Sequence, residues 1–259
     1  MSQQFVAVVP PVERPRLRVE IFIVLGLSLG LSAVYSIINI IDLSTRDVPL
    51  SQQSTALNTS QSSRQVFDFL YQVVGILADL VPVALVAYLL WRAARPHLGN
   101  LGIDGRRPFR DSGWALVLAL VIGVPGILVY IVGRHLGLTV TVAASAGDTY
   151  WWSIPVLLLS AARSGLQEEV IMIGYLYYRL QQLGWGRWKI IVFSAIIRGS
   201  YHLYQGWGSF VGNLAMGILF GWLYTRYGRL LPFVIAHFVI DAAIFVGYPW
   251  AAATFLSNL

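Results

Sequence analysis

Residues 167–176 read QEEVIMIGYL and place two adjacent glutamates, Glu168 and Glu169, inside an apolar run that extends from residue 151 to residue 180. A charged side chain at the centre of a membrane helix costs about 3 kcal/mol on insertion scales, so such groups pair or face a wet cavity and commonly mark a functional site. On an α-helix the two carboxylates point about 100° apart, so we expect them to have different roles. This stretch predicts a membrane-embedded helix that carries part of a polar site.

The composition is that of a membrane protein. Of the 259 residues, 57% are hydrophobic and only 12% are charged, and the mean hydropathy is +0.67. A water-soluble domain of this size could not bury so much apolar surface. The net charge of +6 comes from basic loops, which favour membrane orientation over nucleic-acid binding. The absence of cysteine excludes disulfides, thiolate zinc sites and a cysteine nucleophile.

Seven apolar runs are candidates for membrane helices. They cover residues 21–41, 66–91, 114–132, 151–180, 190–203, 210–224 and 231–248. Because the fourth run is long and the fifth is short, an eighth segment, or a break in the fourth helix around residues 161–165, stays open. The pattern predicts an all-α, polytopic transmembrane helix bundle of about seven spans.

The basic residues predict the orientation of these spans, because cytoplasmic loops are enriched in Lys and Arg. If the N-terminus is internal, the inner loops hold Arg14, Arg16, Arg18, Arg92, Arg95, Arg106, Arg107, Arg110, Arg179, Arg187, Lys189, Arg226 and Arg229. The outer loops hold little beyond Arg46, Arg64 and Arg134. We therefore expect an integral protein of a bacterial plasma membrane, with its N-terminus in the cytoplasm and its C-terminus outside.

The loops divide the chain into three parts. Residues 1–18 are a cytoplasmic tail, and no small-residue cleavage site follows the first apolar run, which indicates a retained anchor. Residues 19–111 form an N-terminal transmembrane pair with a polar external loop and a basic internal loop, and residues 112–259 form the core. The external loop, residues 43–64, is rich in Ser, Thr, Gln and Asn, so we expect it to be flexible and unpacked.

Further polar side chains lie inside the apolar runs. Arg198 and His202 are four residues apart in one run, and His237 and Asp241 are four apart in the last run, so each pair shares one helix face. Together with the two glutamates they can converge on one pocket within a bundle. The alternative for any one of them is a structural ion pair or a helix-helix hydrogen bond. The apolar runs also contain Asp68, Asp79 and Arg163.

This set of residue types suits hydrolysis of a peptide bond, which needs an activated water, a proton donor for the leaving amine and donors for the developing oxyanion. Glu168 with His202 could activate the water, and His237, held by Asp241, could stabilise the oxyanion. Alternatively, Glu168, His202 and His237 could bind Zn²⁺, which lowers the pKa of a bound water. The residues alone leave both mechanisms open.

The paired glutamates, a histidine on the following helix, and a histidine with Asp four residues later resemble the motifs of the CPBP family of intramembrane proteases. This family includes the CAAX prenyl endopeptidases and the bacteriocin-processing or Abi proteins, and its members are often described as metalloproteases. The resemblance covers about residues 151–248. It implies a helical membrane endopeptidase that acts on a membrane-associated peptide or protein, with Zn²⁺ or a metal-free Glu/His mechanism equally allowed.

The resemblance also implies roles for individual residues. Glu168 and His202 would activate water, His237 and Asp241 would form the oxyanion site, and Glu169 would be a supporting carboxylate. Two positions depart from the family pattern. Ile173 stands where the family usually has an arginine, four residues after the second glutamate. Arg198 stands where the family usually has phenylalanine, four residues before the second-motif histidine. We therefore expect Arg198 to reach across the bundle to Glu169 and restore the missing ion pair.

Two other classes of function compete with a protease. A proton-coupled transporter could use the ionisable groups in the runs, but the sequence shows no inverted repeat. A catalytically degenerate member of the family could bind a peptide as a scaffold or immunity protein without cutting it. A serine mechanism through Ser164 and His237 is less favoured, because ARSG at residues 162–165 lacks the first glycine of a GxSG motif. The aromatic residues Tyr201, Tyr204 and Trp207 near His202 are expected to pack rather than to line a substrate groove.

Overall fold

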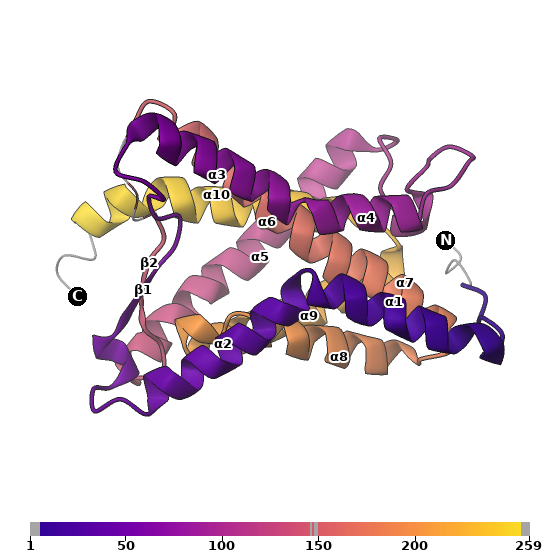
Figure 1. Cartoon of the computed structure of the whole chain (residues 1–259), viewed down its shortest axis with the longest axis horizontal. Coiled ribbons are helices and arrows are strands. Elements are labelled where there is room, and N and C mark those ends of the chain that lie inside the picture. The colour runs from indigo at the N-terminus through magenta and orange to yellow at the C-terminus, as the bar shows by residue number, and fades with distance from the viewer. Residues whose placement is uncertain (1–5, 146, 148–149, 255–259) are drawn as a thin grey trace.

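The computed structural model of the chain describes residues 6–145, 147 and 150–254, and is built almost entirely from helices (Figure 1). The α-helices are α1 (Arg14–Gly26), α2 (Leu29–Ser44), α3 (Gln65–Asp79), α4 (Val81–Leu89), α5 (Pro108–His135), α6 (Ser153–Glu168), α7 (Leu176–Gln182), α8 (Arg187–Ser200), α9 (Trp207–Tyr227) and α10 (Leu231–Thr254). Short 3-10 helices are η1 (Pro11–Glu13), η2 (Leu50–Gln52), η3 (Gly99–Leu101) and η5 (Leu203–Gln205), and η4 (Glu169–Tyr175) is a π-helix. Two strands, β1 (Ser54–Ala56) and β2 (Thr141–Ala143), complete the described chain.

The all-α membrane class is confirmed, whereas the count of seven spans and the topology with the N-terminus inside are not. Within the described residues, three helical stretches are long and apolar enough to cross a membrane: 65–89, 108–135 and 231–248. A fourth candidate is the pair α1 and α2, which is bent by 58°. Each of the other predicted runs is also helical, but α8 has only 14 residues, which is short for a bilayer.

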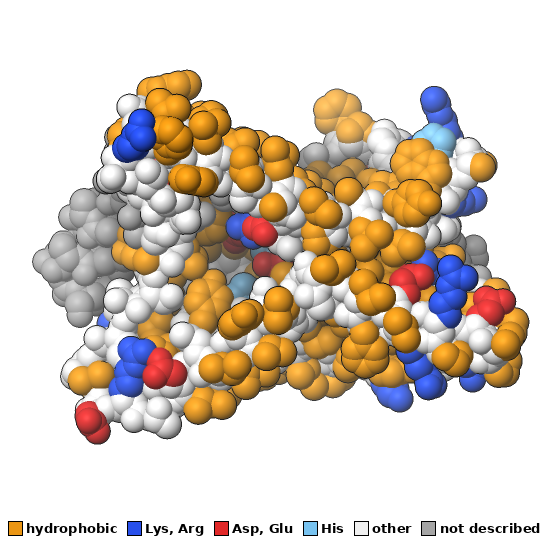
Figure 2. Space-filling view, in the orientation of Figure 1, with side chains coloured by type: hydrophobic (Ala, Val, Ile, Leu, Met, Phe, Trp, Pro, Cys, Tyr) orange, Lys and Arg blue, Asp and Glu red, His pale blue; other side chains and the backbone are white. Residues whose placement is uncertain are grey.

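The helices leave much of their apolar surface uncovered. Only 17% of the most apolar window of helix α5 is buried, and its exposed side chains include Leu120, Val124 and Leu128. Figure 2 shows hydrophobic side chains over most of one face of the molecule. A soluble monomer rarely exposes apolar patches of this extent, so these surfaces fit contact with lipid.

The polar loop at residues 43–64 packs against the rest of the structure, contrary to the expectation that it would be unpacked. Strand β1 pairs in parallel with β2, with Thr55 opposite Val142. The side chain of Gln53 is buried and donates hydrogen bonds to the carbonyls of Leu43 and Val48, at 2.8 and 2.9 Å. The polar side chains of this loop thus bond to backbone groups, which a reading of composition cannot anticipate.

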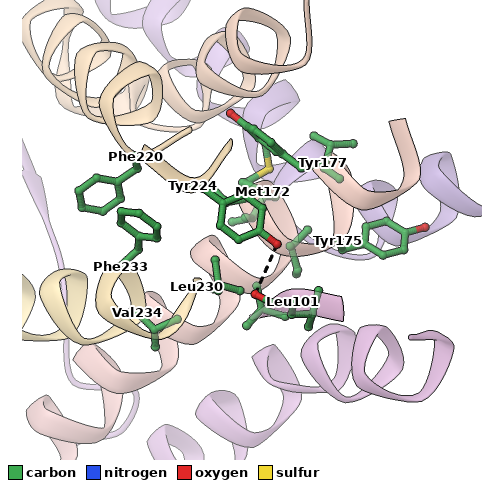
Figure 3. Close-up of a cluster of buried hydrophobic side chains, with 14 of the residues drawn as sticks. Leu101, Met172, Tyr175, Tyr177, Phe220, Tyr224, Leu230, Phe233 and Val234 are labelled. Carbon is green, nitrogen blue, oxygen red and sulfur yellow. Dashed lines mark hydrogen bonds between the residues drawn. The ribbon is translucent and has the colours of Figure 1, made fainter. Parts of the chain in front are cut away.

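The largest core lies where η4, α9 and the start of α10 meet (Figure 3). All seven residues of η4 are buried. Among the aromatic side chains, Phe220 lies 4.9 Å from Phe233 between ring centroids, and the Tyr224 hydroxyl donates to the Leu101 carbonyl at 3.4 Å. The helix break left open around residues 161–165 does not occur, because α6 is continuous to Glu168 and the irregular segment begins at Glu169. π-Helical turns are rare and frequently lie at functional sites.

One ion-pair cluster joins the loop before α5 and the start of α5 to the segment just before α10. Arg229, just before α10, bonds through Nη2 to Asp104 Oδ1 at 3.1 Å and through Nε to Asp111 Oδ1 at 2.9 Å. The hydrogen bond from Arg229 holds the pKa of Asp104 below its ordinary value of 3.8. Asp104 therefore stays ionised in the folded protein at a lower pH than in the unfolded chain.

The stability of the protein should fall at acidic pH partly through Asp104. Because its folded pKa is lowered, this carboxyl stabilises the folded state above about pH 3.8 and loses that effect as the pH falls through its folded-state value. Thermal unfolding in detergent between pH 6 and pH 3 should show a steeper fall of Tm for the unaltered protein than for Asp104→Asn. Equal slopes would contradict this assignment.

Gly165 should be required for the close approach of α6 and α10. A Cβ built on this glycine would lie 2.9 Å from the Val234 carbonyl oxygen and 3.1 Å from the Phe238 backbone nitrogen. Gly165→Ala should therefore force the two helices apart, cost about 1–3 kcal/mol of stability and lower Tm by several degrees. Gly126→Ala in α5 is the matched control, because nothing lies within 4 Å of its added Cβ. An unchanged Tm for Gly165→Ala would contradict this packing.

Candidate active site

The predicted polar residues come together from three helical segments. Glu168 ends α6 and Glu169 begins η4. Arg198 lies in the last turn of α8, and His202 lies just beyond that helix. His237 and Asp241 lie in α10. Figure 2 shows acidic, basic and histidine side chains in a hollow in the middle of one face, with hydrophobic side chains around it. The residue pairs described below supply the distances within this cluster.

Glu169 is the buried anchor of the cluster. Its Oε1 atom accepts a hydrogen bond from Arg198 Nη2 at 2.8 Å and lies 2.7 Å from His237 Nδ1. The side chains of Glu169 and Arg198 are 0% and 1% exposed. The predicted ion pair between these two residues is therefore present. It joins η4 to α8, and the histidine contact extends the connection to α10.

Glu168 faces several donors through one oxygen atom. Its Oε2 atom accepts a hydrogen bond from the Tyr201 hydroxyl at 2.8 Å. The same atom lies 3.6 Å from His202 Nε2, 4.0 Å from His237 Nε2 and 3.6 Å from Arg198 Nη1. The two glutamates thus share Arg198 and His237, because the forked guanidinium and the two-sided imidazole each reach both carboxylates, but both partners lie closer to Glu169.

The two histidines differ in how they are held. His237 is fixed on both sides, because Nδ1 faces Glu169 and Nε2 lies 3.6 Å from Asp241 Oδ2. Neither ring nitrogen of His202 has a hydrogen-bond partner among the described residues, although both atoms are buried. His202 Nε2 lies 3.6 Å from Glu168 Oε2, so a water that bonds to both atoms would lie beside the pair and not between them.

Sequence reasoning missed one member of the cluster and misjudged another acid. Tyr201 was expected to pack, yet its hydroxyl contacts Glu168; its position three residues after Arg198, on the same helix face, was the available signal. Asp68, counted among the membrane acids, instead accepts hydrogen bonds from the Ser62 backbone N–H at 3.3 Å and from Gln72 Nε2 at 2.9 Å. Asp68 therefore stabilises the start of α3.

The proposed zinc ligands do not form a metal site as they are arranged. Within the described part of the chain, no group of three or more His, Asp or Glu side chains is placed to hold a metal ion. In addition, Arg198 lies between the two glutamates, and a cation beside a carboxylate pair opposes the binding of a second cation. The three candidate ligands, Glu168, His202 and His237, thus do not fit Zn²⁺ in this arrangement.

A model of a known protein family matches the region of the chain that contains the candidate site. Residues 150–243 match the family model of the type II CAAX prenyl endopeptidases, Rce1-like. This match contains all six predicted site residues and confirms the resemblance read from the motifs at the level of a CAAX-type protease family. It does not extend to the Abi proteins or to a metal. No curated protein and no solved structure matches the chain.

The ion pair between Arg198 and Glu169 should be strongly coupled. Arg198→Met removes the charge and leaves a buried carboxylate without its cation, so it should cost about 3–5 kcal/mol of stability in chemical unfolding. Adding Glu169→Gln to this variant should recover part of the loss, because the amide needs no counter-ion. Arg46→Met is the control, because its ion pair with Asp42 is exposed. Additive losses in the double variant would contradict the coupling.

Proposed function

We propose that this protein is an intramembrane endopeptidase that cleaves a membrane-associated peptide with a water activated by Glu168 and His202. The observation that carries the proposal is the position of the Glu168 carboxylate. It accepts a hydrogen bond from Tyr201 and lies within 4.0 Å of both imidazoles, in a hollow of an otherwise apolar bundle. The match to the CAAX-type protease family covers these residues.

In the proposed reaction, a water bound to Glu168 Oε2 and His202 Nε2 loses a proton to the carboxylate as its oxygen attacks the scissile carbonyl carbon. The carbonyl oxygen then carries the developing negative charge. When the tetrahedral intermediate collapses, the carbon–nitrogen bond breaks and the amine leaves with the proton that Glu168 accepted. His202 has both ring nitrogens without other partners among the described residues, so it is free to hold the water or pass the proton.

His237 is the proposed oxyanion donor. It lies within 4.0 Å of Glu168, Glu169 and Asp241. With a proton on each ring nitrogen, Nδ1–H donates to Glu169, and Nε2–H, which lies 3.6 Å from Asp241 Oδ2 and so beyond hydrogen-bond distance, donates to the oxyanion. Donors that are already in place before the reaction stabilise the developing charge without reorganisation. Asp241 would position the ring.

Glu169 and Arg198 would hold this arrangement rather than react. Arg198 takes the place of the family's arginine, which is Ile173 here, by approaching Glu169 from α8. The charge of Glu169 is balanced by Arg198, and its Oε1 atom positions His237 through Nδ1. The substrate class that follows is a peptide tethered to a membrane, in accord with the lipid-facing surfaces, and a bacterial plasma membrane remains our expectation for its location.

A peptide-binding protein without protease activity is the second candidate, because Ile173 departs from the family's first motif. It would use the same hollow. A proton-coupled transporter is less favoured, because Asp68 is engaged by backbone N–H groups and a neighbouring side chain and so is not available to a pathway.

Replacement of Glu168 should separate these functions. Glu168→Gln keeps an acceptor for the Tyr201 hydroxyl but cannot take a proton, so it should lower turnover by at least about 10²-fold with little change in Tm. Cleavage of a pool of N-acylated, fluorescence-quenched peptides in proteoliposomes is the measurement. Glu13→Gln, on the exposed N-terminal segment, is the control. Binding of peptides without cleavage by the unaltered protein would favour the non-proteolytic function.

A further inference from the structure

A second arginine within an apolar helix, Arg163, lies near the candidate active site and has no role in the proposed reaction. It is on α6, five residues before Glu168, which places the two backbones about 7.5 Å apart along the helix axis. Its side chain is 26% exposed, and its Nε atom lies 3.6 Å from Asp79 Oδ2 at the end of α3. Arg163 therefore lies where the N-terminal helices meet the core.

The contact between Arg163 and Asp79 is a loose one. The side chain of Asp79 is 52% exposed, and the 3.6 Å between the two atoms is longer than a hydrogen bond. The Nε atom of Arg163 is buried and has no hydrogen-bond partner within the described ranges. A guanidinium carries five donors, so this side chain has capacity for a further anion.

Arg163 lies close enough to the candidate active site to act on its groups. It lies within electrostatic reach of Asp241 and of the Tyr204 hydroxyl, and both of these groups also interact with Glu168. Arg198 differs in that it is fully buried and bonded to Glu169. Of these two cations, Arg163 is the one with a partly exposed side chain.

We propose that Arg163 is a binding residue for a carboxylate on the peptide substrate, and that this carboxylate takes the place of Asp79. The inference rests on the proposed peptide-cleaving function of the same site and adds a charged group to the substrate. A planar guanidinium binds a carboxylate through two parallel hydrogen bonds, and the apolar surroundings strengthen the pair relative to water. The carboxylate is either the peptide's terminal group or an acidic side chain.

Asp79 acts as an internal substitute in this scheme. In the free protein it keeps the guanidinium from being unpaired beside apolar helices. When the substrate carboxylate binds, Asp79 leaves this contact, which already holds it at 3.6 Å with half of its side chain exposed. Peptide binding is thereby coupled to the one charged contact between α3 and α6 in the described structure.

Binding is measured on the Glu168→Gln variant, which should hold peptides without cutting them. The probes are three versions of one N-acylated, fluorescent apolar peptide in lipid nanodiscs: a free carboxyl end, an amidated end, and an amidated end with one glutamate. At least one acidic version should bind about tenfold more tightly than the neutral one. Adding Arg163→Gln should remove that preference, and Arg163→Glu should reverse it. The difference between the two acidic versions identifies the source of the carboxylate.

Two further variants sharpen the test. Asp79→Asn removes the internal competitor and should tighten the binding of the acidic peptide, whereas Arg46→Gln, at an exposed ion pair elsewhere, should change nothing. Equal affinity for all three peptides, or a preference that survives Arg163→Gln, would overturn the proposal. Loss of the preference in discs that contain phosphatidylglycerol would instead assign Arg163 to lipid phosphate and overturn it as well. Turnover by the unaltered protein tests the proposed protease function separately.

Discussion

The buried contact between Glu169 and Arg198 is the constraint on which the rest of the site depends. A carboxylate with no exposure in an apolar bundle is unstable unless a cation or strong donors reach it. Arg198 and His237 both bond to the same oxygen of Glu169, so η4, α8 and α10 are held in one arrangement. Glu168, next to η4, and His202, just after α8, are positioned by that arrangement.

The irregular segment η4 explains how two adjacent acids can share partners. A π-helix winds more widely than an α-helix, and the transition falls between the two glutamates. All seven residues of η4 are buried, so the aromatic and aliphatic core beneath it supports the position of Glu169. The part of the site formed by η4 is thus held by close packing. Where α3 meets α6, the ion pair between Arg163 and Asp79 is a longer contact.

Much of the fold and site followed from the sequence, since long apolar runs become helices and buried charges must be paired. The partner of Glu169 could be predicted because Ile173 stands where the family pattern has an arginine and Arg198 adds one on the next helix. Features that depend on distant backbone were not predictable. The bend between α1 and α2, the packed loop around Gln53 and the π-turn at Glu169 all arise from tertiary contacts that leave no local pattern. The number of spans was not predictable for the same reason, because a short apolar run such as that of α8 forms a helix that packs against neighbours regardless of its length.

The parallel pairing of β1 with β2 also constrains the order of biosynthesis. Asn58, just after β1, bonds to the carbonyl of Ala144, which lies 86 residues later in the chain. At about 5–20 residues per second, the ribosome needs several seconds to deliver the second strand after the first. During that interval the backbone groups of β1 that later bond to β2 have no partner strand and are left to water. This pairing is therefore completed only after all of α5, which lies between the two strands in the chain, has been synthesised.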